Sequence, residues 1–66
     1  MAKGGIKEIK RYEDKKLILF KDVVIKKWFW YRIMDEGDKI SIDYDSEENA
    51  DKERKAKTIH WRTDID

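Results

Sequence analysis

The feature that most constrains this chain is a pair of strand-like stretches on either side of a short turn. Residues 39–45 alternate polar and apolar side chains without a break, the period-two pattern of a strand with one buried face. Residues 28–34 are rich in aromatic side chains, as strands are. The stretch between them, residues 35–38, has the composition of a turn. The sequence therefore predicts an antiparallel hairpin over residues 28–45.

A turn over residues 35–38 places Met34 opposite Lys39 and Tyr31 opposite Ile42. This register gathers apolar side chains on one face and the tryptophans on the other. A slip of one residue would mix the two sets, so the pattern supports the register. The first face, which we expect to be core, holds Phe29, Tyr31, Ile33, Ile40, Ile42 and Tyr44, and the second holds Trp28, Trp30, Arg32 and Met34 opposite Asp45, Asp43, Ser41 and Lys39.

Three further segments have strand character. Residues 6–12 have apolar side chains spaced by three, which also suits a helical turn, but the β-rich neighbourhood favours a strand. Residues 17–25 are apolar and β-branched, and the interruption at Lys21-Asp22 indicates a turn, a bulge or a bend. Residues 58–62 alternate and are expected to form a last strand, with Ile59 and Trp61 on one face.

The segment of residues 46–57 is almost wholly polar, and two structures remain open for it. Acid-to-base pairs four residues apart, such as Glu48 with Lys52, favour a helix, which either Asp45 or Ser46 would cap. A short helix without an apolar stripe is marginal in water, so a mobile loop is the alternative. The sequence therefore allows one short polar helix near residues 46–57.

Together these segments predict a mainly β domain spanning residues 1–66, with a flexible stretch at residues 1–5. Four or five antiparallel strands would form a small meander, or a barrel with an SH3-like or OB-like curl. The chain has 66 residues and no cysteine, so packing alone must stabilise a small core. A cysteine-free chain of this size, without an apolar leader or a long apolar run, is expected to be cytoplasmic.

Charge divides the chain into two halves. Residues 1–33 carry ten basic and four acidic side chains, a net +6, and residues 34–66 carry six basic and eleven acidic ones, a net −5. Such asymmetry is typical of a chain with a charged partner, although the two halves can also interleave in space and cancel. The acidic stretch 43–53 is one candidate contact for a basic partner.

The residue types needed for catalysis and for metal or cofactor binding are scarce. The only histidine, His60, has no nucleophile marked out near it, and it is expected on the exposed face of the last strand. Zinc sites require more Cys and His than the chain has. Residues 43–47 imitate the start of a calcium loop, but Glu48 and Arg54 stand where the loop needs Gly and Glu. We therefore expect no enzyme activity, no metal and no cofactor.

The clearest candidate for function is the run of residues 26–32, where four consecutive aromatic side chains lie between basic ones. Single-stranded DNA or RNA binds by stacking its bases on aromatic side chains beside cations that contact phosphate. The sequence thus predicts a nucleic-acid-binding face made of Lys26, Lys27, Trp28, Trp30, Arg32, Trp61 and Arg62.

Two observations weigh against this hypothesis. A domain this small needs its large aromatic side chains for the core, so Trp28 and Trp30 could be structural. Asp43 and Asp45 also share the tryptophan face in the predicted register, and they would repel phosphate. The alternative function is a protein-interaction or inhibitor module that uses the same aromatic face, a strand edge or the acidic segment, with a homodimer through strand edges as one form. An aromatic cage for a cationic ligand is a third reading.

Overall fold

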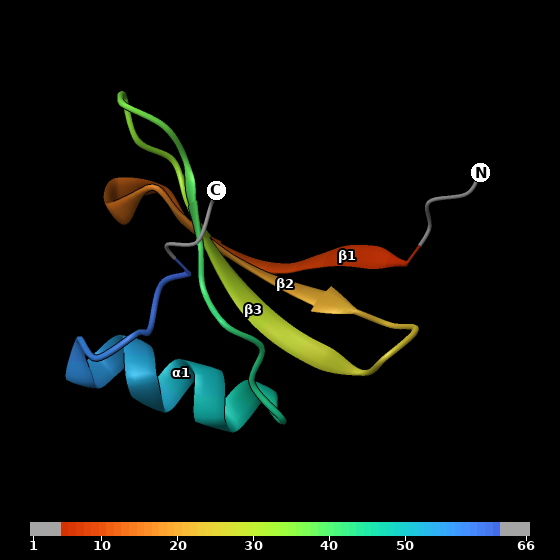
Figure 1. Ribbon diagram of the computed structural model, residues 1–66. Helices are drawn as coiled ribbons and strands as arrows, with labels where there is room; N and C mark the ends of the chain where they lie inside the picture. Colours follow the sequence, from red (N-terminus) through yellow and green to blue (C-terminus); the bar gives the residue numbers. More distant parts are fainter. Residues whose placement is uncertain (1–4, 63–66) are drawn as a thin grey trace.

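A computed structural model describes residues 5–62, which form a four-stranded antiparallel sheet and one helix (Figure 1). The strands follow one another in the sheet in chain order, so the predicted meander is confirmed, as is the short polar helix. Residues 1–4 of the predicted flexible stretch lie outside the described residues, and a single domain over residues 1–66 stays a prediction. The elements are β1 (Ile6–Tyr12), the 3₁₀ turn η1 (Glu13–Lys15), β2 (Leu17–Asp22), β3 (Lys27–Arg32), β4 (Lys39–Ile40) and α1 (Glu47–Ala56).

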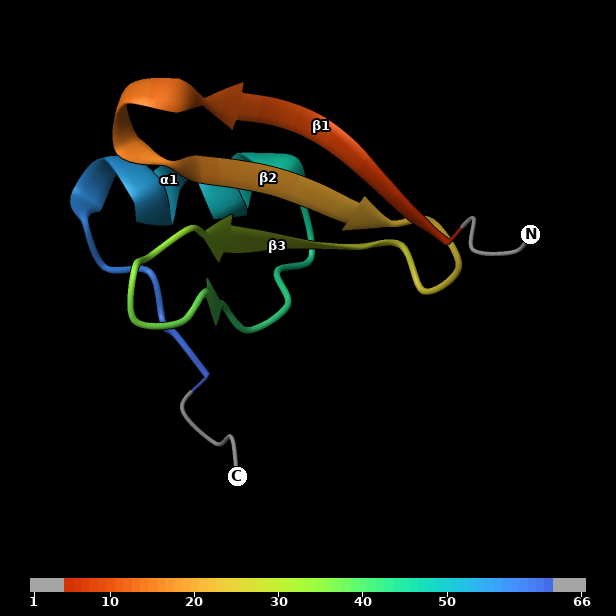
Figure 2. The same ribbon diagram turned by 90° about the horizontal axis from the view of Figure 1, so that it is seen from above.

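The sheet is twisted but open, as Figure 2 shows from above. Strand β1 pairs only with β2, and a bulge between Glu8 and Lys10 interrupts that ladder. Among the described residues the sheet does not close on itself, so the meander is the architecture present and the barrel is not. The outer edge of β1 is therefore a free strand edge.

The predicted strand over residues 17–25 ends early, at Asp22. The Asp22 carboxylate accepts a hydrogen bond from the Val24 backbone N–H at 3.0 Å, and the Asp22 carbonyl accepts one from Lys26 N–H at 2.7 Å. A side chain that binds its own backbone two residues ahead is typical of a turn. The polar interruption in the sequence therefore marks the start of the β2–β3 turn.

The predicted hairpin register between residues 28 and 45 is wrong. Tyr31 faces Ile40 rather than Ile42, and further along the hairpin Tyr44 faces Trp28 rather than Phe29. Between these two points the second strand has one more residue than the first, as in a β-bulge. The extra residue moves Tyr44 from the face of Phe29 to the face of the tryptophans.

Helix α1 begins and ends with local caps. The Ser46 hydroxyl accepts a hydrogen bond from Asn49 N–H at 3.0 Å, so Ser46 rather than Asp45 is the N-cap. At the other end Lys57 adopts the left-handed conformation, and its N–H donates to carbonyls of the last turn. Caps do not hold a ten-residue helix alone, and the sheet supplies the rest: the Trp30 indole N–H donates to the Ala50 carbonyl at 2.9 Å.

The core lies between α1 and one face of the sheet, which we call the covered face. Trp30 and Ala50 are both fully buried there. Because the Ala50 side chain is small, the backbone of α1 can approach the Trp30 indole closely. Ser41 is buried as well, and its hydroxyl accepts from Trp30 N–H at 2.7 Å and donates to the Ile42 carbonyl. The buried cluster consists of Leu17, Leu19, Trp30, Tyr44 and Ala50, with Ile9, Tyr12, Trp28, Ile59 and Trp61 packed against it.

The last predicted strand, residues 58–62, lies beside β4 but makes only a single bridge, between Trp61 and Ser41. Backbone hydrogen bonds on both sides of the bridge, from Ile42 N–H to the His60 carbonyl and from Arg62 N–H to the Ile40 carbonyl, hold the segment in place. Ile59 and Trp61 both point toward the core, as the alternation predicts, and His60 is exposed.

Candidate binding surfaces

The tryptophans predicted to stack bases belong to the covered face. Trp28, Trp30 and Arg32 do share one face of β3, but Trp30 has an exposed fraction of 0%. Trp28 is half-buried, and the Lys21 ammonium lies 4.7 Å from the centroid of its ring. The expectation of an exposed indole pair is therefore wrong, because α1 packs over this face and leaves Trp30 no surface on which a base could stack.

The predicted phosphate-contacting cations are dispersed. Lys26 and Lys27 lie at the start of β3, and Arg32 lies at its far end. Lys27 donates to the Asp45 carboxylate, and this contact raises the pKa of Lys27 and lowers that of Asp45. Arg62 pairs with Asp43 at 3.5 Å. Two of the predicted cations thus already have carboxylate partners.

One pair of predicted residues does come together. The Arg32 guanidinium lies over the Trp61 ring, 5.4 Å from its centroid, although the two residues are far apart in sequence. Trp61 is held there by its bridge to Ser41 and by packing against the core. A guanidinium that lies against an aromatic ring can still donate to another ligand, because its N–H groups lie in its own plane.

The other side of the sheet, which we call the open face, has no helix against it in the described part of the chain (Figure 1). Phe20 stacks on Phe29 with ring centroids 5.6 Å apart, and the Tyr31 ring stands edge-on to Phe20 at 5.9 Å. We expected Phe29 and Tyr31 in the core, but they are only half-buried and lie outside the buried cluster. The side chains on the open face are Ile18, which is buried with an exposed fraction of 5%, and Phe20, Phe29, Tyr31 and Ile40.

A shallow hollow of about 240 Å³ lies on the open face at Phe29. Ile6 and Ile40, which are 51% and 40% exposed, approach it from the two outer strands. Sequence reasoning missed this surface because it expected the more apolar face of the hairpin to be the core. The remaining lining residues are Asp22, Ile25, Asp43 and Arg62.

Charges around the open face are paired with one another. Arg11 binds Glu8 at 2.9 Å, and this hydrogen bond holds the pKa of the Glu8 carboxyl below its ordinary value. The Tyr31 hydroxyl donates to Asp38, which raises the pKa of Tyr31 and lowers that of Asp38. With the Lys27–Asp45 and Arg62–Asp43 pairs, the apolar centre has a rim of both signs.

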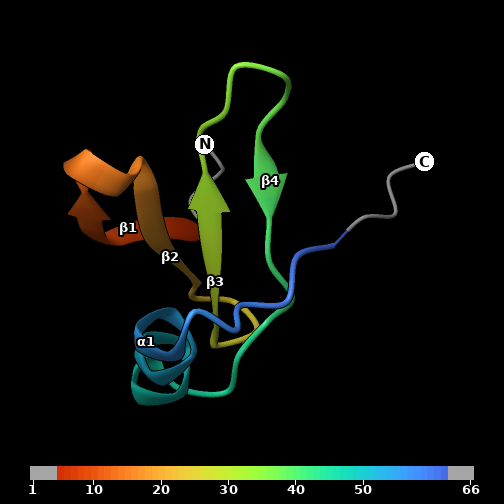
Figure 3. The same cartoon turned by 90° about the vertical axis from the view of Figure 1, so that its left-hand side faces the viewer.

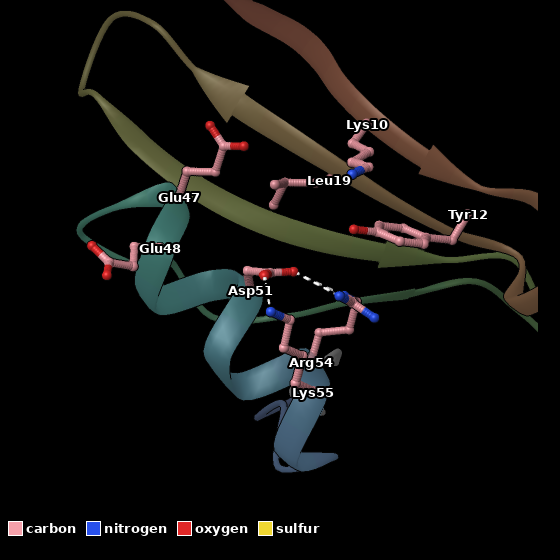
Figure 4. Close-up of a pocket in the computed structure, with 8 residues that line it drawn as sticks. All are labelled: Lys10, Tyr12, Leu19, Glu47, Glu48, Asp51, Arg54 and Lys55. Atoms are coloured by element: carbon pink, nitrogen blue, oxygen red, sulfur yellow. Dashed lines mark hydrogen bonds and ion pairs between the residues drawn. The ribbon is translucent and has the colours of Figure 1, made fainter.

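A groove of about 520 Å³ separates α1 from β1 and β2 (Figure 4). Asp51 binds both Arg54, at 2.8 Å, and Lys55, at 3.3 Å, and these contacts lower the pKa of Asp51. Arg54 also lies 4.4 Å from the centroid of the Tyr12 ring. Three cations therefore face three carboxylates in this groove: Lys10, Arg54 and Lys55 face Glu47, Glu48 and Asp51.

Comparison of the chain with protein-family models, with curated proteins and with solved structures gives no match. Over residues 5–62, no helix is long and apolar enough to cross a membrane. The same residues contain no group of three His, Asp or Glu side chains arranged to hold a metal ion. Functional inference therefore rests on the surfaces described above.

Proposed function

We propose that this protein is a non-enzymatic protein-interaction domain whose binding surface is the open face of the sheet. The observation that carries the proposal is the cluster of Phe20, Phe29 and Tyr31 outside the core. Aromatic side chains dominate the energetics of protein interfaces, and exposed apolar patches with a polar rim are typical of them. A cytoplasmic location remains a prediction from the sequence.

Charge favours a protein over a nucleic acid as the occupant of this face. A phosphate backbone is bound by cations free to exchange their counterions, whereas Arg11, Lys27 and Arg62 each have a carboxylate partner. Paired charges of both signs around an apolar centre match the rim of a protein interface. The open face thus supports the interaction function that the sequence left as the alternative.

The free edge of β1 is a weaker candidate for docking. Charged side chains and a bulge along an edge strand are features that prevent edge-to-edge pairing, and β1 has both. A homodimer through strand edges therefore has less support than contact through the open face.

Site-specific photocrosslinking tests the proposal. A benzophenone-bearing amino acid replaces Phe29, at the hollow, and in a control protein replaces Lys52, which is exposed on α1. In the cells that make the protein, we expect discrete protease-sensitive adducts from position 29 and none from position 52. Equal adducts from both positions, or adducts removed by nuclease alone, would overturn the proposal.

Sedimentation of the purified protein shows whether the crosslinked partner is a second copy of this chain or a different protein. If the partner is a second copy, the wild type dimerises with rising concentration and Phe29→Ser stays monomeric. If the wild type is also monomeric, the crosslinked partner is a different protein. Binding of single-stranded DNA or RNA that Phe29→Ser weakens would instead assign the open face to nucleic acid.

A further inference from the structure

A cleft of about 430 Å³ is lined by residues of η1, the start of β2, the end of β3, the end of α1 and the segment that follows it. Figure 3 shows the backbones of β2, β3 and α1. Four cations and two aliphatic side chains line the cleft, and no carboxylate does: the lining residues are Lys15, Leu17, Arg32, Arg54, Lys57 and Ile59. We propose that this basic cleft binds the phosphate group of a ligand. The proposal concerns a different part of the surface from the open face and does not depend on it.

The apolar part of the cleft belongs to the rigid core. Leu17 is 1% exposed and pairs across the sheet with Arg32, and Ile59 packs against the buried cluster. Anchoring of this kind holds the backbone positions from which the four cations extend. Low-dielectric walls also strengthen the field that these cations produce in the cleft.

Both guanidiniums are held in place by aromatic rings. Arg32 lies over Trp61 at 5.4 Å, and Arg54 lies over Tyr12 at 4.4 Å. The Nε and Nη2 of Arg54 donate to Asp51 at 3.0 and 2.8 Å, so Arg32 supplies the pair of parallel donors for a ligand. A planar guanidinium presents parallel N–H donors that match two oxygens of a phosphate. Side chains already fixed by packing lose less conformational entropy when a ligand binds.

The positive charge of the cleft is only partly compensated. Within the described residues neither Arg32 nor Lys57 forms an ion pair, Lys15 has only Asp14 at 3.7 Å, and Arg54 has Asp51. The groove of Figure 4, in contrast, brings equal numbers of cations and carboxylates together. The surplus in the basic cleft selects for an anion, and the apolar contacts from Leu17 and Ile59 favour one attached to a larger molecule.

The backbone at Lys57 provides a variant that separates binding from folding. Lys57 has φ 61°, in the left-handed region where glycine is the preferred residue. Lys26 has φ 58° away from the cleft, so this conformation does not by itself mark a site. Lys57→Gly removes a cleft cation and relieves the backbone, so the melting temperature should stay unchanged or rise.

Titration with inorganic pyrophosphate, followed by ¹⁵N NMR, tests the proposal. We expect saturable shifts at the Nε–H group of Arg32 and at the amides of Lys57 and Ile59. Arg32→Gln should weaken binding by about tenfold or more, because it removes charge-assisted hydrogen bonds. Lys57→Gly should weaken it by several-fold, and the control Lys52→Gln, on α1 outside the cleft, should leave it unchanged.

Oligothymidylate with and without a 5′-phosphate distinguishes a terminal phosphate from the phosphates of a strand. Shifts with the 5′-phosphorylated oligomer alone indicate a terminal phosphate, and equal, steeply salt-dependent shifts with both indicate a strand. Shifts scattered over lysines outside the cleft, or equal weakening by Lys52→Gln and Lys57→Gly, would overturn the proposal. So would the absence of saturation with every one of these probes.

Discussion

The two faces of β3 differ sharply although their side chains look alike in sequence. Trp30 is fully buried beneath α1, whereas its neighbours Phe29 and Tyr31 are only half-buried, on the face that has no helix against it within residues 5–62. Both faces carry aromatic rings along the same strand. The two faces differ because α1 packs against one of them. Aromatic content alone therefore does not distinguish the core from a binding surface.

Three residues distant in sequence determine which face is covered. Ala50 brings the helix backbone close enough to accept the Trp30 indole N–H, and Ser41 accepts the Trp30 backbone N–H. Tyr44 joins the same side because of the extra residue before it, and its hydroxyl accepts from His60 N–H at 3.2 Å. Polar contacts therefore fix the helix to the tryptophan face.

The largest expected effect contrasts Trp30→Ala with Phe29→Ala. Truncating a fully buried tryptophan costs about 3–5 kcal/mol, which is close to the whole stability of a domain this small. Truncating Phe29 removes mainly cross-strand contacts and should cost about 1 kcal/mol. Urea unfolding followed by circular dichroism measures both.

We expect Trp30→Ala to be largely unfolded without urea and Phe29→Ala to unfold cooperatively. The reverse order would mean that the helix packs on the face of Phe29. Equal costs would mean that both faces are buried.

The second largest effect that we expect comes from removing the buried hydroxyl of Ser41. Ser41→Ala leaves the Trp30 backbone N–H, which donates to this hydroxyl at 2.7 Å, without that acceptor. A buried donor that loses its partner costs about 1–3 kcal/mol. Ser41→Ala should therefore lower the free energy of unfolding by this amount, and a neutral result would show that the Trp30 N–H has another acceptor.

Removing the N-cap of α1 tests whether this cap helps to keep the helix packed against the covered face. Ser46→Ala removes the acceptor of the Asn49 N–H and should cost about 1 kcal/mol. Ser46→Asp, which retains an acceptor, is the control and should be close to neutral. If the cap helps to keep α1 packed over the tryptophans, acrylamide should quench tryptophan fluorescence more strongly in Ser46→Ala than in Ser46→Asp, and equal quenching would show that it does not.

The smallest expected effect is a dependence of stability on pH at Asp51. Its contacts with Arg54 and Lys55 lower its pKa in the folded protein. The stabilisation is therefore present above the pKa of the unfolded chain and is lost as pH falls through the folded pKa. Because the side chain is partly exposed, we expect a few tenths of a kcal/mol.

In Asp51→Asn this part of the acid dependence should disappear. Thermal unfolding between neutral and acidic pH measures it, with Glu36→Gln in the β3–β4 loop as a control of equal charge change. An identical acid dependence in wild type and Asp51→Asn would contradict the assignment.

The sequence predicts most of the secondary structure because its signals are local. Alternation, the turn residues and the two candidate caps locate β1, β2, β3 and α1 to within a few residues, whereas the strand predicted over residues 39–45 is present only at Lys39–Ile40. The extra residue before Tyr44 leaves no such local signal, since Ile42 and Asp43 continue the alternation. This irregularity moves Tyr44 to the tryptophan face, because a shift of one residue moves a side chain to the opposite face. Which of the two faces α1 covers depends on contacts between residues distant in sequence, such as the one between Trp30 and Ala50.

The candidate sites were less predictable than the fold. The sequence predicts Arg32 and Trp61 as binding residues from their residue types alone. Their contact depends on the position of residues 58–62 beside β4. The basic cleft combines four cations from three segments, η1, β3 and the end of α1, none of which forms a motif in the sequence. Such sites exist only after the chain has folded.

The most direct test of the central claim, that α1 covers the tryptophan face and leaves the phenylalanine face open, is a nuclear Overhauser spectrum of the wild-type protein. The structure predicts cross-peaks between the Trp30 indole ring and the protons of Ala50. It also predicts no cross-peaks between α1 and the rings of Phe29 or Tyr31. Cross-peaks from Ala50 to Phe29 or Tyr31, with none to Trp30, would contradict the account.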